Sequence, residues 1–179
     1  MRLLLLSVVV LLLSACGNVP VEHYRDETPR LDLSHFFTGQ VQASGIFQKR
    51  SGEVAKRFRV DINGHMQGPN LILDERFVYS DGTRQQRTWT LVPTGNGHWQ
   101  GTAGDVIGVA EGQVSGNTLH WKYTLDLEVD GTRHPVQLDD WMFLMDDNTL
   151  VNRSYMSKFG VEVGQISLFF TRATAAPAR

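Results

Sequence analysis

Cysteine is almost absent from this chain of 179 residues, and its single occurrence, Cys16, ends the only long hydrophobic run. One cysteine cannot form an internal disulfide, so the chain is not a disulfide-stabilised domain of the kind common among exported proteins. A free reactive thiol or an intermolecular bridge is one interpretation of Cys16. The six histidines are scattered, without an HExxH spacing or a cysteine partner. Because metal sites require ligands at set spacings, we expect no metal and no cofactor.

Several signatures of common functional classes are missing as well. Basic residues number 17 against 19 acidic ones, without a basic run, which argues against nucleic acid as a partner. No Gly-x-Ser-x-Gly motif accompanies the histidines, which argues against a serine hydrolase. The glycines at positions 101, 104, 108 and 112 lack the Gly-Lys-Ser/Thr ending of a phosphate loop and fit bulges or close approaches in curved strands. We therefore expect a protein that is not an enzyme and has no catalytic residue.

The N-terminus has the pattern of a secretory signal peptide. A short positive start is followed by apolar residues from Leu3 to Leu13, broken only by Ser7, and then by small residues. This run is shorter than the roughly 20 apolar residues of a membrane-spanning helix. The stretch LSAC, which ends at Cys16, resembles the lipobox of bacterial lipoproteins. The resemblance implies cleavage before Cys16 and acyl chains on it, and two or three such chains hold a protein stably on a membrane.

This leader predicts the location of the protein and the division of the chain. Residue 17 is glycine rather than the aspartate of an inner-membrane retention signal, so we expect a lipid-anchored protein on the inner leaflet of the outer membrane, facing the periplasm. Residues 1–15 form the signal peptide, and residues 16–35, which are mixed and charged, form the lipidated N-terminus and a tether. Residues 36–172 form the folded domain, and residues 173–179 form a disordered tail.

Alternation of apolar and polar residues dominates the folded domain. It holds over residues 37–45 and again over residues 119–129. A period of two places alternate side chains on opposite faces of a strand, so both stretches are predicted to be strands with one dry face. The residues of the second stretch that we expect to face the interior are Leu119, Trp121, Leu125 and Leu127.

Turn-forming pairs separate the strand candidates. Pairs such as Asn63-Gly64, Asp81-Gly82 and Asp130-Gly131 recur at intervals of one strand length, and no convincing amphipathic helix lies between them. Parallel sheets need helical crossovers, so the strands form an antiparallel meander, which ends as a sandwich or as a closed barrel. Short sequential turns without a Greek-key connection favour the barrel. We predict an all-β fold, a single antiparallel up-and-down β-barrel of eight to ten strands.

Four stretches of the folded domain resemble a known protein family. They are LDERFVYSDG (73–82), GTAGDVIGVAEG (101–112), LDDWMFLMD (138–146) and LVNRSYMSKFG (150–160). They are similar to an uncharacterised family of proteobacterial lipoproteins, domain of unknown function 3833, whose members resemble calycins, the lipocalin-like barrels. The resemblance covers roughly residues 36–172 and implies the same barrel. It implies no catalytic residue, because the family has no established activity.

Two acidic residues stand on otherwise apolar strand faces. Glu75 shares the odd face of residues 71–79, and Asp140 shares the even face of residues 136–144. A carboxylate in a dry barrel costs several kcal/mol unless it is paired. One interpretation places both acids at the barrel mouth or in structural ion pairs, and another makes them polar anchors for the head group of a ligand. Acid–base catalysis is a third. The arginines available as partners are Arg57, Arg59, Arg87 and Arg153.

Three functions from different classes are open. The first is a barrel that binds a small apolar ligand such as a fatty acyl chain or lipid, with Glu75, Asp140, Arg87 and Arg153 as the ligand-binding candidates. The second is a structural or interaction lipoprotein of the cell envelope with a filled core and an undetermined protein partner. The third is an enzyme acting on lipid or cell-wall material. Contact with the membrane through acyl chains on Cys16 favours the first, as do the small residues of the first strand, which leave room inside: Gly39, Ala43 and Gly45.

Overall fold

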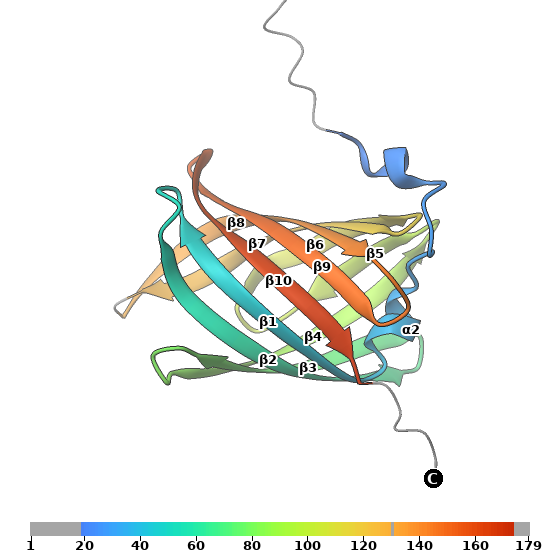
Figure 1. Ribbon diagram of the computed structural model, residues 1–179, viewed down its shortest axis with the longest axis horizontal. Helices are drawn as coiled ribbons and strands as arrows, with labels where there is room; N and C mark the ends of the chain where they lie inside the picture. Colours follow the sequence, from blue (N-terminus) through green and yellow to red (C-terminus); the bar gives the residue numbers. More distant parts are fainter. Residues whose placement is uncertain (1–18, 130, 174–179) are drawn as a thin grey trace, which may run out of the picture.

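The computed structural model describes residues 19–129 and 131–173, which form a barrel preceded by two short helices (Figure 1). The helices are η2 (Val21–Tyr24) and α2 (Leu33–Phe37). The strands are β1 (Gly39–Lys49), β2 (Val54–Gln67), β3 (Asn70–Tyr79), β4 (Arg84–Gly95), β5 (His98–Thr102), β6 (Val106–Ser115), β7 (Thr118–Val129), β8 (Thr132–Leu144), β9 (Thr149–Lys158) and β10 (Val161–Arg172). Within the described residues, neither helix is long and apolar enough to cross a membrane.

The strands close into one ring. Each strand is antiparallel to the next in sequence, and β10 pairs with β1 so that no edge is left open. In that closing pair, Val41 lies opposite Arg172 and Lys49 opposite Gly164. Closure gives every strand a neighbour on both sides, which removes the exposed edges that a sandwich would keep. The predicted all-β, antiparallel up-and-down barrel is therefore confirmed, with ten strands.

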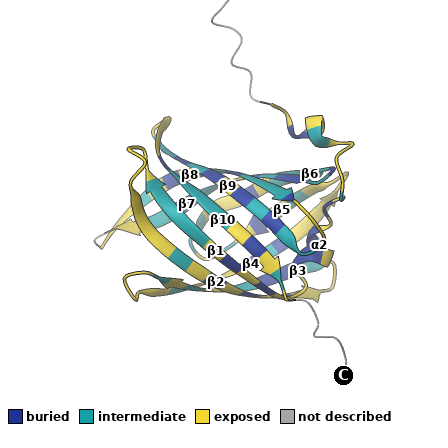
Figure 2. Cartoon of the chain, in the orientation of Figure 1, coloured by how far each residue is buried: buried dark blue, intermediate teal, exposed yellow. Residues whose placement is uncertain are grey.

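Alternation decides which side chains fill the barrel. Along β7, Leu119, Trp121 and Leu125 are buried, and Leu127 also faces the interior. His120 and Lys122, which alternate with the first of these, lie on the outer face, where both pair with Asp139 of β8. Figure 2 shows buried and exposed residues mixed along the strands in this way. The orientation predicted for β7 is confirmed.

Helix α2 closes one end of the barrel. It begins after Asp32, whose side-chain oxygen accepts a hydrogen bond of 3.0 Å from the backbone N–H of His35. Phe36 and Phe37 of this helix are buried, and the Phe37 ring packs edge-on against Phe170 of β10 with 5.8 Å between centroids. Figure 1 shows α2 at the end of the barrel where β10 finishes. We call this end the capped end.

The structure corrects the prediction of a tether over residues 16–35, from residue 19 onward. Val21 and Leu31 are buried, and the backbone N–H of Leu31 donates a 2.8 Å hydrogen bond to the carbonyl of Gly116. Tyr24 packs edge-on against Phe143 of β8, with 5.4 Å between ring centroids. The sequence of this segment has no periodic pattern of apolar residues, and its side chains pack on surfaces that exist only after the barrel has formed. The segment is therefore part of the folded domain.

The opposite end of the barrel carries the turns that follow β1, β3, β7 and β9, because strand direction alternates around the ring. At this end the barrel wall is shorter where β5 lies. Strand β5 has only five residues, whereas β4 has twelve and β6 has ten. The β5–β6 loop therefore turns back part-way along the barrel, and its Asp105 reaches the interior.

Glycines make room for the indole of Trp121, one of two tryptophans that line the interior. A Cβ atom at Gly101 would lie 2.6 Å from the Trp121 ring, and a Cβ at Gly112 would also collide with this indole. Gly108 has a φ of +74° and falls where β6 shifts its register against β7. The interpretation of these three glycines as close approaches and a bulge is therefore confirmed. It is wrong for Gly104, which lies in the β5–β6 loop, where a Cβ atom would have no neighbour within 4 Å.

Trp121→Ala is expected to lower the free energy of unfolding by roughly 3–5 kcal/mol, because it removes a buried indole that packs edge-on against Trp89. Chemical denaturation followed by circular dichroism measures the change. Val109→Ala is the control, since Val109 is 53% exposed on β6, and it should change stability by less than about 0.5 kcal/mol. Equally small effects of the two substitutions would contradict this packing.

Candidate functional site

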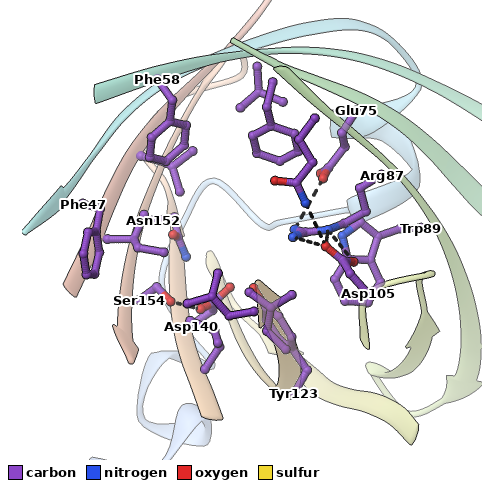
Figure 3. A pocket seen from close by; sticks show the side chains of 18 of the residues that line it. Phe47, Phe58, Glu75, Arg87, Trp89, Asp105, Tyr123, Asp140, Asn152 and Ser154 are labelled. Atoms are coloured by element: carbon purple, nitrogen blue, oxygen red, sulfur yellow. Dashed lines mark hydrogen bonds and ion pairs between the residues drawn. The ribbon is translucent and has the colours of Figure 1, made fainter. Parts of the chain in front are cut away.

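A cavity of about 930 Å³ occupies the interior of the barrel (Figure 3). It ends against Leu33 and Phe37 at the capped end and reaches the exposed residues Lys56, Arg84 and Arg133 at the other end, which we call the mouth. Pockets for small molecules typically span about 300–1,000 Å³, so this cavity has the size of a ligand site. The barrel is hollow, in contrast to the filled core of the interaction-lipoprotein hypothesis.

Most of the cavity wall is apolar. Its aliphatic members include Ile62, Leu73, Leu91, Leu119 and Leu138, and its aromatic members include Phe47, Phe58, Phe77, Trp89 and Trp121. Gly45 does not provide the free space that the sequence suggested, because Phe58 and Leu168 atoms lie 3.0 Å from the position of a Cβ there. A wall of this composition suits an apolar molecule and leaves its orientation to a few polar groups.

The first polar cluster consists of Glu75, Arg87 and Asp105. Glu75 and Arg87 are register partners on β3 and β4, and both point into the barrel. Arg87 donates from Nε to Asp105 Oδ1 at 2.9 Å and from Nη2 to Asp105 Oδ2 at 2.8 Å, a bidentate pair. Arg87 Nη1 lies 3.8 Å from Glu75 Oε2, an ion pair without a hydrogen bond. Arg87 is therefore committed to Asp105, and Glu75 is left weakly paired.

The second polar cluster lies across the cavity on β8 and β9 (Figure 3). Asp140 and Ser154 are register partners, and the Ser154 hydroxyl donates a short hydrogen bond to Asp140 Oδ1. Asn152 is 1% exposed, and its Nδ2 donates to the carbonyl of Trp141 at 3.5 Å. That carbonyl can only accept, so it fixes the amide with Oδ1 turned away. Asn152 Oδ1 has no hydrogen-bond partner within the described chain.

Burial shifts the protonation of the acids in both clusters. Burial raises the pKa of Glu75 to about 7, against the opposing effect of Arg87, and Asp105 and Asp140 raise it further. Burial also raises the pKa of Asp140 to about 7, although the Ser154 hydrogen bond lowers it. Burial opposes the charge of Arg87, but the attraction of Glu75 and the hydrogen bonds to Asp105 together raise its pKa above the usual value. Near neutral pH the two buried acids therefore sit close to their titration points while Arg87 stays charged.

The structure brings three of the four predicted ligand-binding residues together. Glu75, Arg87 and Asp140 all line the cavity, and Glu75 forms an ion pair with Arg87 there, while its role as an anchor for a ligand stays a prediction. Arg153 is corrected: it is exposed on the outer face, where its Nη2 donates to Gln165 Oε1 at 2.6 Å. The reason is strand phase, since the residues on either side of Arg153 in β9 point inward. The lipidation candidate Cys16 lies outside the described residues.

Sequence reasoning missed Asp105, Asn152, Ser154 and Tyr123, which also line the cavity. Alternation contained the signal for three of them. Tyr123 shares the odd face of β7 with Trp121 and Leu125, and Asn152 and Ser154 share the even face of β9 with the buried residues Leu150 and Met156. Asp105 carries no such signal. It lies in a loop, and its approach to Arg87 depends on the length of β5.

Comparison with known proteins identifies the family and the fold. A family model described as "Protein of unknown function (DUF3833)" matches residues 10–172. No curated protein matches the chain. The structure of the S-type phycobiliprotein lyase CPES from Guillardia theta has a TM-score of 0.59 at 7% identity and covers 82% of this chain and 96% of its own. A redesigned β-barrel, mFAP1, bound to DFHBI has a TM-score of 0.44 at 10% identity, covering 78% and 97%. The lyase shares the lipocalin-like barrel with this chain.

Glu75→Gln is expected to flatten the dependence of stability on pH. The pKa of Glu75 is raised from 4.5 to about 7 on folding, so its stabilising proton is fully present below about pH 4.5 and is lost as the pH rises through about 7. Relative to the variant, the wild-type free energy of unfolding should therefore fall by up to about 3 kcal/mol between those values. Denaturant titrations across this range measure the difference.

Glu111→Gln is the matched control for that experiment, because Glu111 is exposed on β6. Its curve of stability against pH should run parallel to that of the wild type. Parallel curves for Glu75→Gln and the wild type would show that Glu75 titrates alike in the folded and unfolded states.

Proposed function

This chain belongs to the DUF3833 family, and we propose that its barrel binds a single small, largely apolar molecule, with a fatty acyl chain or another lipid chain as the ligand. The cavity carries this proposal. It is of ligand size, it is closed by α2 at one end, and it opens toward exposed residues at the other. An apolar chain entering at the mouth would remove its own surface and that of the wall from water, which is favourable by about 25 cal/mol per Å².

The polar clusters support binding rather than catalysis. The side chains that could react are already engaged with one another: the Ser154 hydroxyl donates to Asp140, and the Arg87 guanidinium is held by Asp105. None of the described residues that line the cavity is a histidine or a cysteine. A few polar groups in an apolar wall are the usual means by which a binding site fixes the orientation of its ligand. The proposed role is therefore that of a carrier or receptor for the ligand.

The proposed location is the inner leaflet of the outer membrane, facing the periplasm, with acyl chains on Cys16. The lipobox-like stretch and the glycine at position 17 support it. The first buried residue of the described chain is Val21, five residues beyond Cys16, and five extended residues span at most roughly 18 Å. An anchor on Cys16 would therefore hold the barrel close against the bilayer, which is the most abundant local source of lipid chains.

Binding can be tested with diphenylhexatriene, a neutral hydrocarbon whose fluorescence rises in apolar surroundings. We expect saturable binding of one molecule per protein. Leu127→Trp should weaken binding at least about tenfold, because Leu127 is half-buried on the cavity wall and a larger side chain there extends into the free volume. Val78→Trp is the matched control, since Val78 is exposed on β3 and should leave binding unchanged.

Two results would refute a ligand-binding barrel. One is a lack of saturable binding by the wild-type protein, and the other is equal binding by Leu127→Trp and Val78→Trp. Circular dichroism and thermal denaturation of both variants establish that they are folded, so that loss of binding reports on the cavity alone.

The anchor is tested by expressing the Cys16→Ser variant in bacterial cells and measuring how much of it is found in the membrane fraction. Without the thiol no thioether to lipid can form, so the variant should leave the membrane fraction and appear as unprocessed or soluble protein. Mass spectrometry of the wild-type N-terminus should find acyl chains on Cys16. A variant that still fractionates fully with membranes would contradict the lipobox interpretation.

A further inference from the structure

The cations of the cavity are already engaged or lie at its mouth. Of the described residues that line the cavity, four are cationic: Lys56, Arg84, Arg87 and Arg133. Arg87 alone lies in the interior, and its guanidinium is held by the bidentate pair with Asp105. Lys56 and Arg133 form ion pairs at the mouth with Asp81 and Asp126. The interior therefore offers no uncommitted positive group to a ligand.

The free polar atoms in the interior are acceptors. Glu75 Oε2 and Asn152 Oδ1 are buried without a hydrogen-bond partner in the described chain. Asp140 is 6% exposed and receives one hydrogen bond from Ser154, which leaves further lone pairs on its carboxylate. The Tyr123 hydroxyl can donate or accept, so it excludes neither kind of ligand group. A buried acceptor without a donor costs about 1–3 kcal/mol, and a ligand that supplies the donor removes this cost.

These acceptors lie on opposite sides of the cavity. Strands β3 and β8 are on opposite sides of the closed ring, with Glu75 on the first and Asp140 on the second. Figure 3 shows the two clusters facing each other across the open volume. With its carboxyls ionised, the interior holds Glu75, Asp105 and Asp140 against the single charge of Arg87, an excess of two negative charges. Both the position of the acceptors and the sign of the charge favour a cation between the clusters.

We infer that the ligand carries a protonated amine, which lies between Glu75 on one wall and Asp140 and Asn152 on the other while the apolar chain fills the rest of the cavity. This inference rests on the proposed function and deepens it. A primary ammonium group has three donors, which matches the three acceptors. Its burial is compensated because it is paired and hydrogen-bonded on both sides. A carboxylate in the same place would face three acids and would find the guanidinium occupied.

Protonation of the acids should switch this preference. The charged and titratable groups that act on Glu75 are Arg87, Asp105, Asp140, Tyr79 and Tyr123. Those that act on Asp140 inside the barrel are Ser154, Tyr123 and Arg87, and Asp139 acts on it from the outer face of β8. Near pH 8 Glu75 and Asp140 are mostly ionised and accept from an ammonium group. Near pH 5 they are mostly protonated, so they lose the negative charge that attracts an amine. Binding of an amine should therefore weaken as the pH falls through about 7.

The test is displacement of diphenylhexatriene by amphiphiles that share one alkyl length, each below its micelle concentration. Dodecylamine should displace the probe from the wild-type protein at a concentration at least about tenfold lower than dodecanoate at about pH 8. Dodecanol should fall between the two. Glu75→Gln and Asp140→Asn should each reduce the preference for dodecylamine while the neutral probe still binds, and the exposed-site control Glu111→Gln should retain it.

The outcomes separate this inference from the proposed function. Equal displacement by the amine and the carboxylate, or a preference for the carboxylate, would overturn the inference and leave the binding barrel intact. A preference that persists unchanged in both acid variants would overturn the assignment to these residues. Failure of diphenylhexatriene to bind the wild-type protein would refute the proposed function itself, and the inference would fall with it. The comparison on the wild-type protein stands even where one variant does not fold.

Discussion

Closure of the ring is the constraint on which the rest of this structure depends. Pairing of β1 with β10 gives every strand two hydrogen-bonded neighbours and forces alternate side chains of all ten strands toward one shared interior. The ring circumference is then set by strand number, not by the volume of the inward side chains. Because those side chains include large aromatics on some strands and small or short polar groups on others, they do not fill the space, and a cavity remains.

The interior polar groups follow from the same ring. Arg87 and Glu75 face inward because both occupy inward positions of adjacent strands, and the shortness of β5 lets Asp105 reach the guanidinium from a loop. A guanidinium without a partner in this apolar wall would strongly destabilise the fold, because Arg87 stays charged. Asp105 is therefore the residue that compensates for the burial of the Arg87 charge. Because Asp105 takes two hydrogen bonds from the guanidinium, Glu75 is left with an ion pair to Arg87 but no hydrogen bond.

Period-two alternation was sufficient to predict the strands, the inward face of β7, and the inward positions of Glu75 and Asp140, because these properties are local to a strand. The closed barrel was predicted from the short sequential turns, and Arg87 was named as an available partner, without an inward position assigned to it. The same alternation, applied to β9, would have placed Arg153 on the outer face, because Arg153 lies between the inward residues Asn152 and Ser154. Two features had no local signal. The packing of residues 19–38 depends on surfaces that exist only after closure, and the reach of Asp105 depends on where β5 ends.

The polar groups of the interior carry a cost that the fold offsets elsewhere. Glu75 and Asp140 are buried, their pKa values are raised to about 7, and acceptors without a partner in the described chain lie beside them, so this barrel is less stable by itself than one with an apolar interior of the same shape. A purely structural barrel would gain from replacing these groups by aliphatic side chains. Two such clusters, facing each other across a cavity of about 930 Å³ that is closed at one end by α2, are therefore better explained by a ligand that satisfies them than by the stability of the barrel itself.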